Sequence, residues 1–452
     1  MANPSCGTVA VYLLCRQQWD LHGVGINQQA LIIQALKNLR KGLEQLNVPL
    51  LVLDAKSFAQ VPRLISLLCS NLSVERLFFN VEYPVNERQR DIQVVDMLPD
   101  QVECIRSVGQ SLVPPWEIVN HEGKGYKVFS AFARRVHASL DKKPLLILPA
   151  PTPKPKDNYE SFDHSLNSQH LPDELSTIFP IVKVMPDVSE KMVAKQLVKF
   201  VDDNVRLYSE SRNIPSIAGT SELSAALAIG TISVRRCFEF ARRHAKNYAA
   251  TWLDELIWRD FYRAVMWHYP HVCCGHAFNK IDRAIRWSDS SSAFNAWRRG
   301  ETGVPIVDAA MKQLVATGWM HNRLRMIVAS YLTKNLFIDW RLGEAFFSEH
   351  LFDYDFASNN GGWQWCASVG TDAAPYFRVF SPASQQKRFD PQAEFIKRWL
   401  PQLAQKSAVD IHRFETHRLQ NYCSLQVDLK QSRQQAIEAF KVAKLTSTRL
   451  PP

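Results

Sequence analysis

Aromatic and charged side chains are mixed between Trp252 and Tyr262 in a way that could support proton transfer or ligand binding. On a helix, Trp252, Glu255, Arg259 and Tyr262 share one face. A carboxylate among aromatic rings is desolvated, so Glu255 could hold or donate a proton near neutral pH. The alternative is an ordinary amphipathic helix with a surface ion pair, which this segment alone does not exclude.

A second mixed segment runs from Thr317 to Met326. If it is helical, Trp319, Asn322, Arg323 and Met326 lie on one face. A core-facing stripe would be leucine or isoleucine, and a solvated stripe would be glutamate or lysine. A ring, an amide, a guanidinium and a thioether together suit a flat ligand that needs both stacking and hydrogen bonds, although a structural role is equally open.

Two further segments carry polar groups suited to binding a ligand. Asp353 and Asp355 precede the run 359–365, in which paired asparagines and paired glycines would let the backbone approach a ligand closely. The segment 220–224 offers hydroxyl groups and free amides that could hold phosphate, with a plain N-cap as the alternative. The glycine fingerprint of a Rossmann dinucleotide site is absent from the sequence.

The elements that must position these groups change character along the chain. The first third alternates apolar β-rich runs with helical patterns, which predicts a parallel sheet with crossover helices. The predicted strands are 8–13, 48–53 and 76–79, and the predicted helix 27–46 carries an apolar face. The apolar face of this helix consists of Ile32, Leu36, Leu39, Leu43 and Leu46. A fourth apolar run covers residues 144–148.

Prolines at alternate positions in 149–156 predict an extended linker, with polar residues continuing to about His170. From about Ser189 the patterns are helical. We therefore expect an α/β domain, a long connector and a larger all-helical domain.

Composition narrows the class of protein. The chain has 452 residues, a formal net charge of +10 and nine scattered cysteines. The charge favours an anionic partner such as nucleic acid. The cysteines lack zinc-site spacing, so we expect no metal and reduced thiols in a cytoplasmic protein. Neither a membrane-spanning apolar run nor a secretory signal is recognisable.

Together these segments resemble the photolyase and cryptochrome family, and within it the class I cyclobutane pyrimidine dimer photolyases of the folate-antenna type. The resemblance extends from about Thr8 to Leu400 and is most specific at 252–262, 318–326, 353–365 and 371–378. It implies light-driven repair of cyclobutane pyrimidine dimers in DNA, by electron transfer from excited reduced FAD to a flipped-out dimer, in a monomeric protein. The implied domains are an α/β antenna-binding domain (1–125), a connector (126–188) and an all-helical FAD-binding catalytic domain (189–452).

The resemblance also implies roles for individual residues. The FAD phosphates and neighbouring groups are expected at Tyr208, Thr220, Ser221, Leu223 and Ser224. The rest of FAD is expected at Trp252, Asn322, Arg325, Asp353, Asp355 and Asn359, with Arg325 paired to Asp353 and Asn359 facing flavin N5. The lesion cavity is expected at Glu255, Trp258, Asn322, Arg323, Met326 and Trp365. Glu255, Asn322 and Asn359 are the expected catalytic residues, and Arg323 and Lys387 are expected to hold DNA phosphates.

Trp287, Trp340 and Trp363 match the family's electron-transfer tryptophans, although Trp287 and Trp340 could equally be core aromatics. The runner-up function is a cryptochrome-like blue-light sensor that binds FAD without repair. Asn359 argues against it, because many cryptochromes carry aspartate or cysteine there. Asn322 and Met326 likewise differ from the histidines of (6-4) photolyases. A helical nucleic-acid-binding protein without cofactor leaves the mixed face of 319–326 unexplained.

The N-terminal region departs from the family pattern. The family's first strand is missing from this sequence, so we expect a sheet that lacks it and a misplaced start or a truncation. Buried backbone groups left unpaired cost about 1–3 kcal/mol each. His22, Asn86 and Glu87 match the antenna site for methenyl folate, but Cys274 replaces an expected lysine. We therefore expect folate to bind weakly or not at all.

Overall fold

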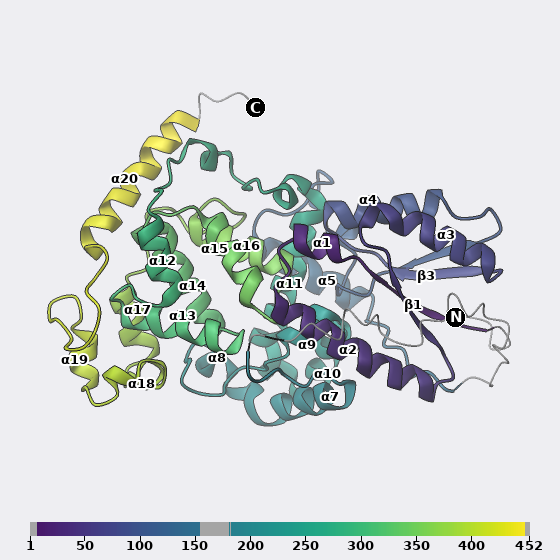
Figure 1. Ribbon diagram of the computed structural model, residues 1–452, viewed down its shortest axis with the longest axis horizontal. Helices are drawn as coiled ribbons and strands as arrows, with labels where there is room; N and C mark the ends of the chain where they lie inside the picture. Colours follow the sequence, from purple (N-terminus) through teal and green to yellow (C-terminus); the bar gives the residue numbers. More distant parts are fainter. Residues whose placement is uncertain (1–6, 154–179, 181, 448–452) are drawn as a thin grey trace.

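The computed structural model describes residues 7–153, 180 and 182–447. An α/β part built by the N-terminal chain lies beside a larger helical part (Figure 1). This confirms the predicted fold class. Of the predicted linker, residues 149–153 carry neither helix nor strand, and the remainder to His170 lies outside the described residues.

Four short strands form two separate parallel pairs in the α/β part. β1 (Ala10–Leu14) pairs with β2 (Leu50–Asp54), and β3 (Arg76–Asn80) pairs with β4 (Glu103–Ser107). The sequence predicted β1, β2 and β3 to within two residues. It missed β4, because a glutamate, an arginine and a serine interrupt its apolar pattern. The apolar run 144–148 forms no strand.

A broad cavity of about 2680 Å³ is bordered by β1 and β3 and by the helices around them. The predicted apolar face of the long N-terminal helix lines this cavity, and Leu39 on that face remains 42% exposed. Phe78 of β3 is 45% exposed. The apolar patterning therefore identified the correct face, but here that face borders a cavity. The helices of this part are α1 (Arg16–Leu21), α2 (Ile26–Gln45), α3 (Val61–Asn71) and α4 (Val85–Asp96).

The helical part contains two large clusters of buried apolar side chains. One joins α5 to the helices between 190 and 272, and the other includes the helices from 291 onward. The longer helices are α5 (Phe129–Lys142), α7 (Glu190–Lys199), α10 (Val234–Ala245), α11 (Ala250–His268), α12 (Ser291–Arg299), α13 (Pro305–Thr317), α14 (Asn322–Ser330), α15 (Trp340–His350), α16 (Phe356–Ala367), α17 (Pro382–Phe389) and α20 (Leu429–Ser447). The shorter ones are α8 (Tyr208–Ser211), α9 (Ser224–Ile229), α18 (Glu394–Trp399) and α19 (Ala408–His412), with the 3-10 helix η8 (Lys280–Ala284) and the π-helix η9 (Tyr331–Asn335).

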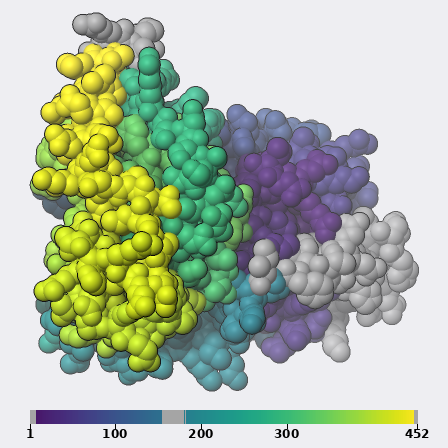
Figure 2. Space-filling model, turned by 60° about the vertical axis from the view of Figure 1, so that its left-hand side comes forward, coloured from purple at the N-terminus to yellow at the C-terminus, as the bar shows by residue number. Residues whose placement is uncertain are grey.

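The C-terminal helix α20 lies along the outside of the helical part (Figures 1 and 2). It packs against η8 and η9. Its Phe440 ring covers the buried ammonium of Lys334, whose Nζ lies 3.6 Å from the ring centroid. Burial lowers the pKa of Lys334 to about 7. No helix among the residues that the structure describes is long and apolar enough to cross a membrane.

The break between α13 and α14 corrects one local expectation. Gly318 has a φ of 67° and ends α13, and His321 caps α14 by accepting a hydrogen bond from the Arg323 amide at 3.1 Å. Burial and the nearby arginines lower the pKa of His321 to about 4, so its ring is neutral and can accept. Trp319 therefore precedes the helix and does not share its face with Asn322.

The two parts are joined directly at the start of α2. The Asn27 side-chain amide donates to the His350 carbonyl at 2.8 Å, and the Gln28 amide donates to the Tyr354 carbonyl at 2.5 Å. Both side chains are buried. The α/β part thus braces the loop that connects α15 to α16.

Candidate active site

A cavity of about 130 Å³ lies in the helical part, where α14, α15 and α16 meet. Five residues expected to hold a flavin line it, and they come from three separate chain segments. They are Asn322, Arg325, Asp353, Asp355 and Asn359. Met326 and Trp363 line it too. The structure thus brings together five of the six side chains that the sequence proposed for the isoalloxazine, ribose and adenine of FAD; Trp252 is the exception.

A buried ion pair forms one wall of this cavity. Arg325 Nη2 donates to both carboxylate oxygens of Asp353, at 3.0 and 2.8 Å, and its Nε donates to the Met320 carbonyl. The Asp353 side chain is 1% exposed. The expected pairing of Arg325 with Asp353 is therefore present, and the second anchor fixes the guanidinium plane.

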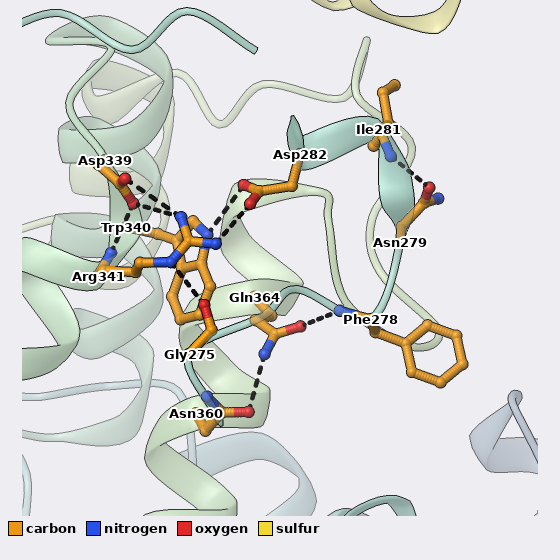
Figure 3. A network of polar contacts seen from close by, with 10 residues as sticks. All are labelled: Gly275, Phe278, Asn279, Ile281, Asp282, Asp339, Trp340, Arg341, Asn360 and Gln364. Atoms are coloured by element: carbon orange, nitrogen blue, oxygen red, sulfur yellow. Dashed lines mark hydrogen bonds and ion pairs between the residues drawn. The ribbon is translucent and has the colours of Figure 1, made fainter. Parts of the chain in front are cut away.

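Asn359 is held with its amide in one orientation. Its Nδ2 donates to the Glu344 main-chain carbonyl at 3.0 Å, which leaves its side-chain oxygen free as an acceptor. The Glu344 carboxylate accepts from Asn360. Gln364 links Asn360 to the Phe278 amide (Figure 3). Burial raises the pKa of Glu344 to about 7.

Asp355 caps α16 and lies between two cavities. Its carboxylate accepts from the Ser358 amide and pairs with Arg263 at 2.5 Å. Burial alone would raise the pKa of Asp355, but Arg263 and Arg259 hold it well below its usual range. Asp355 borders both the 130 Å³ cavity and the large cavity of the α/β part. The two cavities are therefore adjacent.

The paired glycines of α16 have different surroundings. A Cβ on Gly361 would lie 2.0 Å from the Tyr262 ring, so glycine there lets α11 and α16 approach closely. Gly362 lines the cavity, and a Cβ on it would meet nothing within 4 Å. The space beside Gly362, the fixed acceptor on Asn359 and the Arg325–Asp353 pair fit a flat ring with hydrogen-bonding edges.

Trp363 combines a cavity-facing position with deep burial, being 2% exposed. Its ring packs against α15 at Gly343, where a Cβ would approach it to 2.1 Å. Trp340 lies one turn before Gly343 on the same helix and is fully buried. Trp297, which the sequence did not single out, lies 6.1 Å from Trp363 between ring centroids.

Trp287 is partly buried beneath α20. Its ring lies 5.1 Å from Phe337 and 6.2 Å from Phe440, measured between centroids. The three tryptophans expected to transfer electrons thus occupy the cavity wall, the core of α15 and the packing under α20. Their role in electron transfer stays a prediction.

The expected lesion side is built around Glu255. Its carboxylate pairs with Arg212 at 2.7 Å, and the two side chains are 27% and 23% exposed. Burial raises the pKa of Glu255, and Arg212 opposes that shift. Arg212 was not predicted, since a single arginine in a turn shows no pattern in the sequence.

Arg323 lies on the same side as Glu255, and burial and the nearby Arg212 lower its pKa. Its guanidinium donates to the Asn213 side chain at 2.7 Å and lies 4.6 Å from the Phe389 ring centroid. Arg388 covers the same ring at 5.2 Å, and both Arg388 and Lys387 are exposed. These residues form a basic rim.

Trp258 and Trp365 are both partly exposed, as a base-stacking surface requires. One face of Trp258 is covered by Phe129, with 3.7 Å between ring centroids. Trp365 packs at 6.2 Å from Phe380. Each ring is therefore supported from the protein side.

Some predicted FAD residues lie outside the 130 Å³ cavity. Tyr208 and Trp252 both pack against Phe200, at 5.6 and 5.0 Å between ring centroids. The hydroxyl segment does not cap α9, whose N-cap Leu223 makes no side-chain hydrogen bond. The residues outside this cavity are Tyr208, Thr220, Ser221, Leu223, Ser224 and Trp252.

The three antenna candidates meet at the large cavity. Asn86 Nδ2 lies 3.1 Å from His22 Nε2, and Glu87 lies 3.8 Å from the other ring nitrogen. Gln18, which was not predicted, lies 2.6 Å from His22 Nε2. Cys274 is exposed on the helical part.

Comparison with known proteins agrees with this geometry. Residues 2–156 match the family described as DNA photolyase, and residues 252–442 match the FAD binding domain of DNA photolyase. The deoxyribodipyrimidine photo-lyase of Escherichia coli (strain K12) is 36% identical over 98% of this chain and 94% of its own length.

Two solved structures show the same fold. An archaeal photolyase from Sulfolobus tokodaii, solved with two FAD molecules, superposes with a TM-score of 0.80 at 29% identity, covering 96% of this chain and 94% of its own. A Synechocystis cryptochrome superposes with a TM-score of 0.78 at 25% identity, covering 96% of this chain and 93% of its own. The family matches span both parts of the molecule, and the curated relative aligns over nearly its full length. The chain therefore belongs to the DNA photolyase family.

Proposed function

We propose that the protein is a deoxyribodipyrimidine photo-lyase that uses blue light to split cyclobutane pyrimidine dimers in DNA. The carrying observation is one cavity that assembles the Arg325–Asp353 pair, Asn359 and Trp363 close to the basic rim around Glu255. The proposal includes the class I folate-antenna type. It assigns the antenna to residues 1–125, the connector to 126–188 and FAD to 189–452.

When bound in reduced form, FAD supplies the electron that light drives into the dimer. Arg325 and Asp353 hold the ring edge, and Asn322 lines the same wall. Asn359 would offer its side-chain oxygen as an acceptor to the bound ring. The hydroxyl groups in 220–224, together with Tyr208 and Trp252, would hold the phosphates and the remaining groups of FAD.

On the DNA side, the chain's residues bind and orient the lesion. A damaged, poorly stacked site costs less to flip out than a normal base pair. Trp258 and Trp365 stack on the two bases, and Met326 packs between the flavin and lesion sides. Glu255 releases Arg212 and hydrogen-bonds to the dimer, which frees Arg212 to join Arg323 in binding phosphate.

Replacing Glu255 by alanine is expected to lower repair about tenfold to a hundredfold while FAD stays bound. A hydrogen bond to a charged group contributes about 1.5–3 kcal/mol, and each 1.4 kcal/mol is about tenfold. Asp254→Ala is the matched control, because that neighbouring carboxylate faces His137. Repair under limiting light measures the effect, and equal yields in the two variants would exclude the role.

DNA binding is expected to weaken as salt rises, because each phosphate contact releases counterions and contributes about 0.9 to the log–log slope. Arg388→Ala is expected to make the slope shallower by about 0.9, which is the contribution of one phosphate contact. Lys41→Ala is the control, since Lys41 lies on α2 in the α/β part. Titration of dimer-containing DNA at several salt concentrations provides the measurement. An unchanged slope for Arg388→Ala would remove Arg388 from the binding rim.

The proposal extends to the antenna chromophore, the oligomeric state and the cellular location. His22, Asn86 and Glu87 would bind a methenyl folate, weakly because Cys274 provides no cation for its glutamate tail. The adjacency of the two cavities at Asp355 suits energy transfer from such an antenna. The protein is proposed to act as a monomer in the cytoplasm.

The deciding experiment is light-dependent repair of an oligonucleotide that carries a single thymine dimer. Reduced holoprotein should restore the thymines under blue light and not in the dark. A flavin-containing protein that fails to repair under these conditions would support the cryptochrome-like sensor. Denaturation should release non-covalent FAD, and absence of flavin after reconstitution would contradict the whole proposal.

A further inference from the structure

A buried carboxylate contacts the indole nitrogen of Trp340 (Figure 3). Trp340 Nε1 donates to Asp282 Oδ1 at 3.2 Å. Trp340 is 0% exposed and Asp282 is 8% exposed, so water does not screen this contact. Asp282 belongs to η8, 58 residues before Trp340 in the sequence.

Arg341 balances this carboxylate from the other side. Its Nη2 donates to Asp282 Oδ2 at 2.5 Å, its Nη1 pairs with Asp339 at 3.1 Å, and its Nε donates to the Gly275 carbonyl. The guanidinium carbon lies 4.5 Å from the Trp340 ring centroid. Trp340 therefore has a negative group at its N–H edge and a positive group over its ring.

These two charges act in opposite directions on an oxidised indole. A one-electron oxidised tryptophan carries positive charge, which its N–H bond shares. A charge-assisted hydrogen bond to a carboxylate stabilises that charge, and a buried environment strengthens the effect. A guanidinium near the ring face stabilises the neutral ring and destabilises the oxidised one.

We propose that Asp282 is a positioning residue for Trp340 that stabilises its one-electron oxidised form, so that Trp340 loses an electron more easily than it would without Asp282. Arg341 acts in the opposite direction and limits this stabilisation. The inference rests on the proposed function and on the electron-transfer role that the family resemblance predicts for Trp287, Trp340 and Trp363. For each photon, oxidised flavin gains one electron and a thiol in solution loses one. Each tryptophan loses one electron and regains one. The Trp340 proton stays in its hydrogen bond to Asp282 throughout.

The test compares Asp282→Asn with Asp339→Asn in purified holoprotein. Both variants remove one carboxylate partner of Arg341, but only the first removes charge from the Trp340 N–H. We expect Asp282→Asn to lower the initial rate of flavin photoreduction about tenfold, the scale of one lost charge-assisted hydrogen bond. Asp339→Asn should remain within about twofold of the parent, as expected for a partly exposed pair. Asp282→Glu should restore part of the rate.

A second readout is independent of flavin. In protein labelled with ¹⁵N-tryptophan, the indole N–H resonance that disappears in Trp340→Phe identifies Trp340. Asp282→Asn should shift that resonance upfield, as expected for a weaker hydrogen bond, and Asp339→Asn should leave it in place. If Asp282→Asn does not fold, Arg341→Gln is informative alone, because the proposal requires photoreduction at or above the parent rate.

These outcomes distinguish the proposed electron path from the role of Asp282 within it. If Trp340→Phe photoreduces normally, the proposed electron path is wrong. If Trp340→Phe is blocked while Asp282→Asn and Asp339→Asn behave alike, the path stands and the role of Asp282 is overturned. A slower Arg341→Gln would equally contradict the balance of charges.

Discussion

Replacing Trp363 by phenylalanine is expected to abolish light-driven reduction of bound FAD while repair by chemically reduced protein continues. Trp363 is the one predicted electron-transfer tryptophan that lines the cavity, and Trp340 and Trp287 lie farther from it in the packing. Phenylalanine keeps most of the packing against Gly343 but is much harder to oxidise. Steady blue illumination with a thiol reductant, followed by absorbance of the flavin, measures the effect.

Trp297→Phe is the matched control for this experiment. Trp297 is also fully buried and contacts Trp363, but it does not line the cavity. Its variant should suffer a comparable loss of packing and still photoreduce. Normal photoreduction in Trp363→Phe, or loss in both variants, would show that electrons reach the cavity by another route.

Asp353→Asn is expected to weaken FAD binding by about tenfold to a hundredfold. A charge-assisted hydrogen bond contributes about 1.5–3 kcal/mol, and Arg325, which is 24% exposed, would keep only its bond to the Met320 carbonyl. Arg325 would then lose its fixed orientation at the cavity wall. Equilibrium titration of the apoprotein with FAD provides the affinity.

The control must separate binding from stability. Asp308 is fully buried, accepts hydrogen bonds from Thr302, Gly303 and Tyr422, and does not line the cavity. Asp308→Asn should lower the melting temperature without changing FAD affinity. If both variants bind FAD equally well, the Arg325–Asp353 pair only supports the fold.

The sequence predicted those parts of the site whose residues lie close together along the chain. The segments around Asn322, Asp353 and Asn359 were recognisable because unusual polar groups recur there at helical or turn spacing. Their meeting at one cavity is consistent with that prediction. Strands with apolar runs were predicted because that signal is also local in the sequence. β4 was missed because its residues alternate irregularly in polarity.

Contacts between distant segments could not be predicted in this way. Arg212 reaches Glu255 across 43 residues, and Asp282 reaches Arg341 across 59. Nothing in the local sequence of either arginine indicates its partner. The Trp319 expectation was wrong for a different reason, because one glycine and one neutral histidine divide the segment into two helices.

The divided sheet gives the two halves of the molecule different mechanical character. Each strand of the α/β part has only one strand neighbour among the described residues, so neither pair forms the wide, continuous sheet usual for parallel strands. Parallel strands are normally part of larger sheets covered on both faces, and a two-stranded pair contributes few ladder hydrogen bonds to local stability. Cooperative unfolding should therefore begin in the α/β part at a fraction of the global cost, before the tightly packed helices yield. Because Asn27 and Gln28 brace the loop before α16, such early opening would also loosen one edge of the flavin cavity.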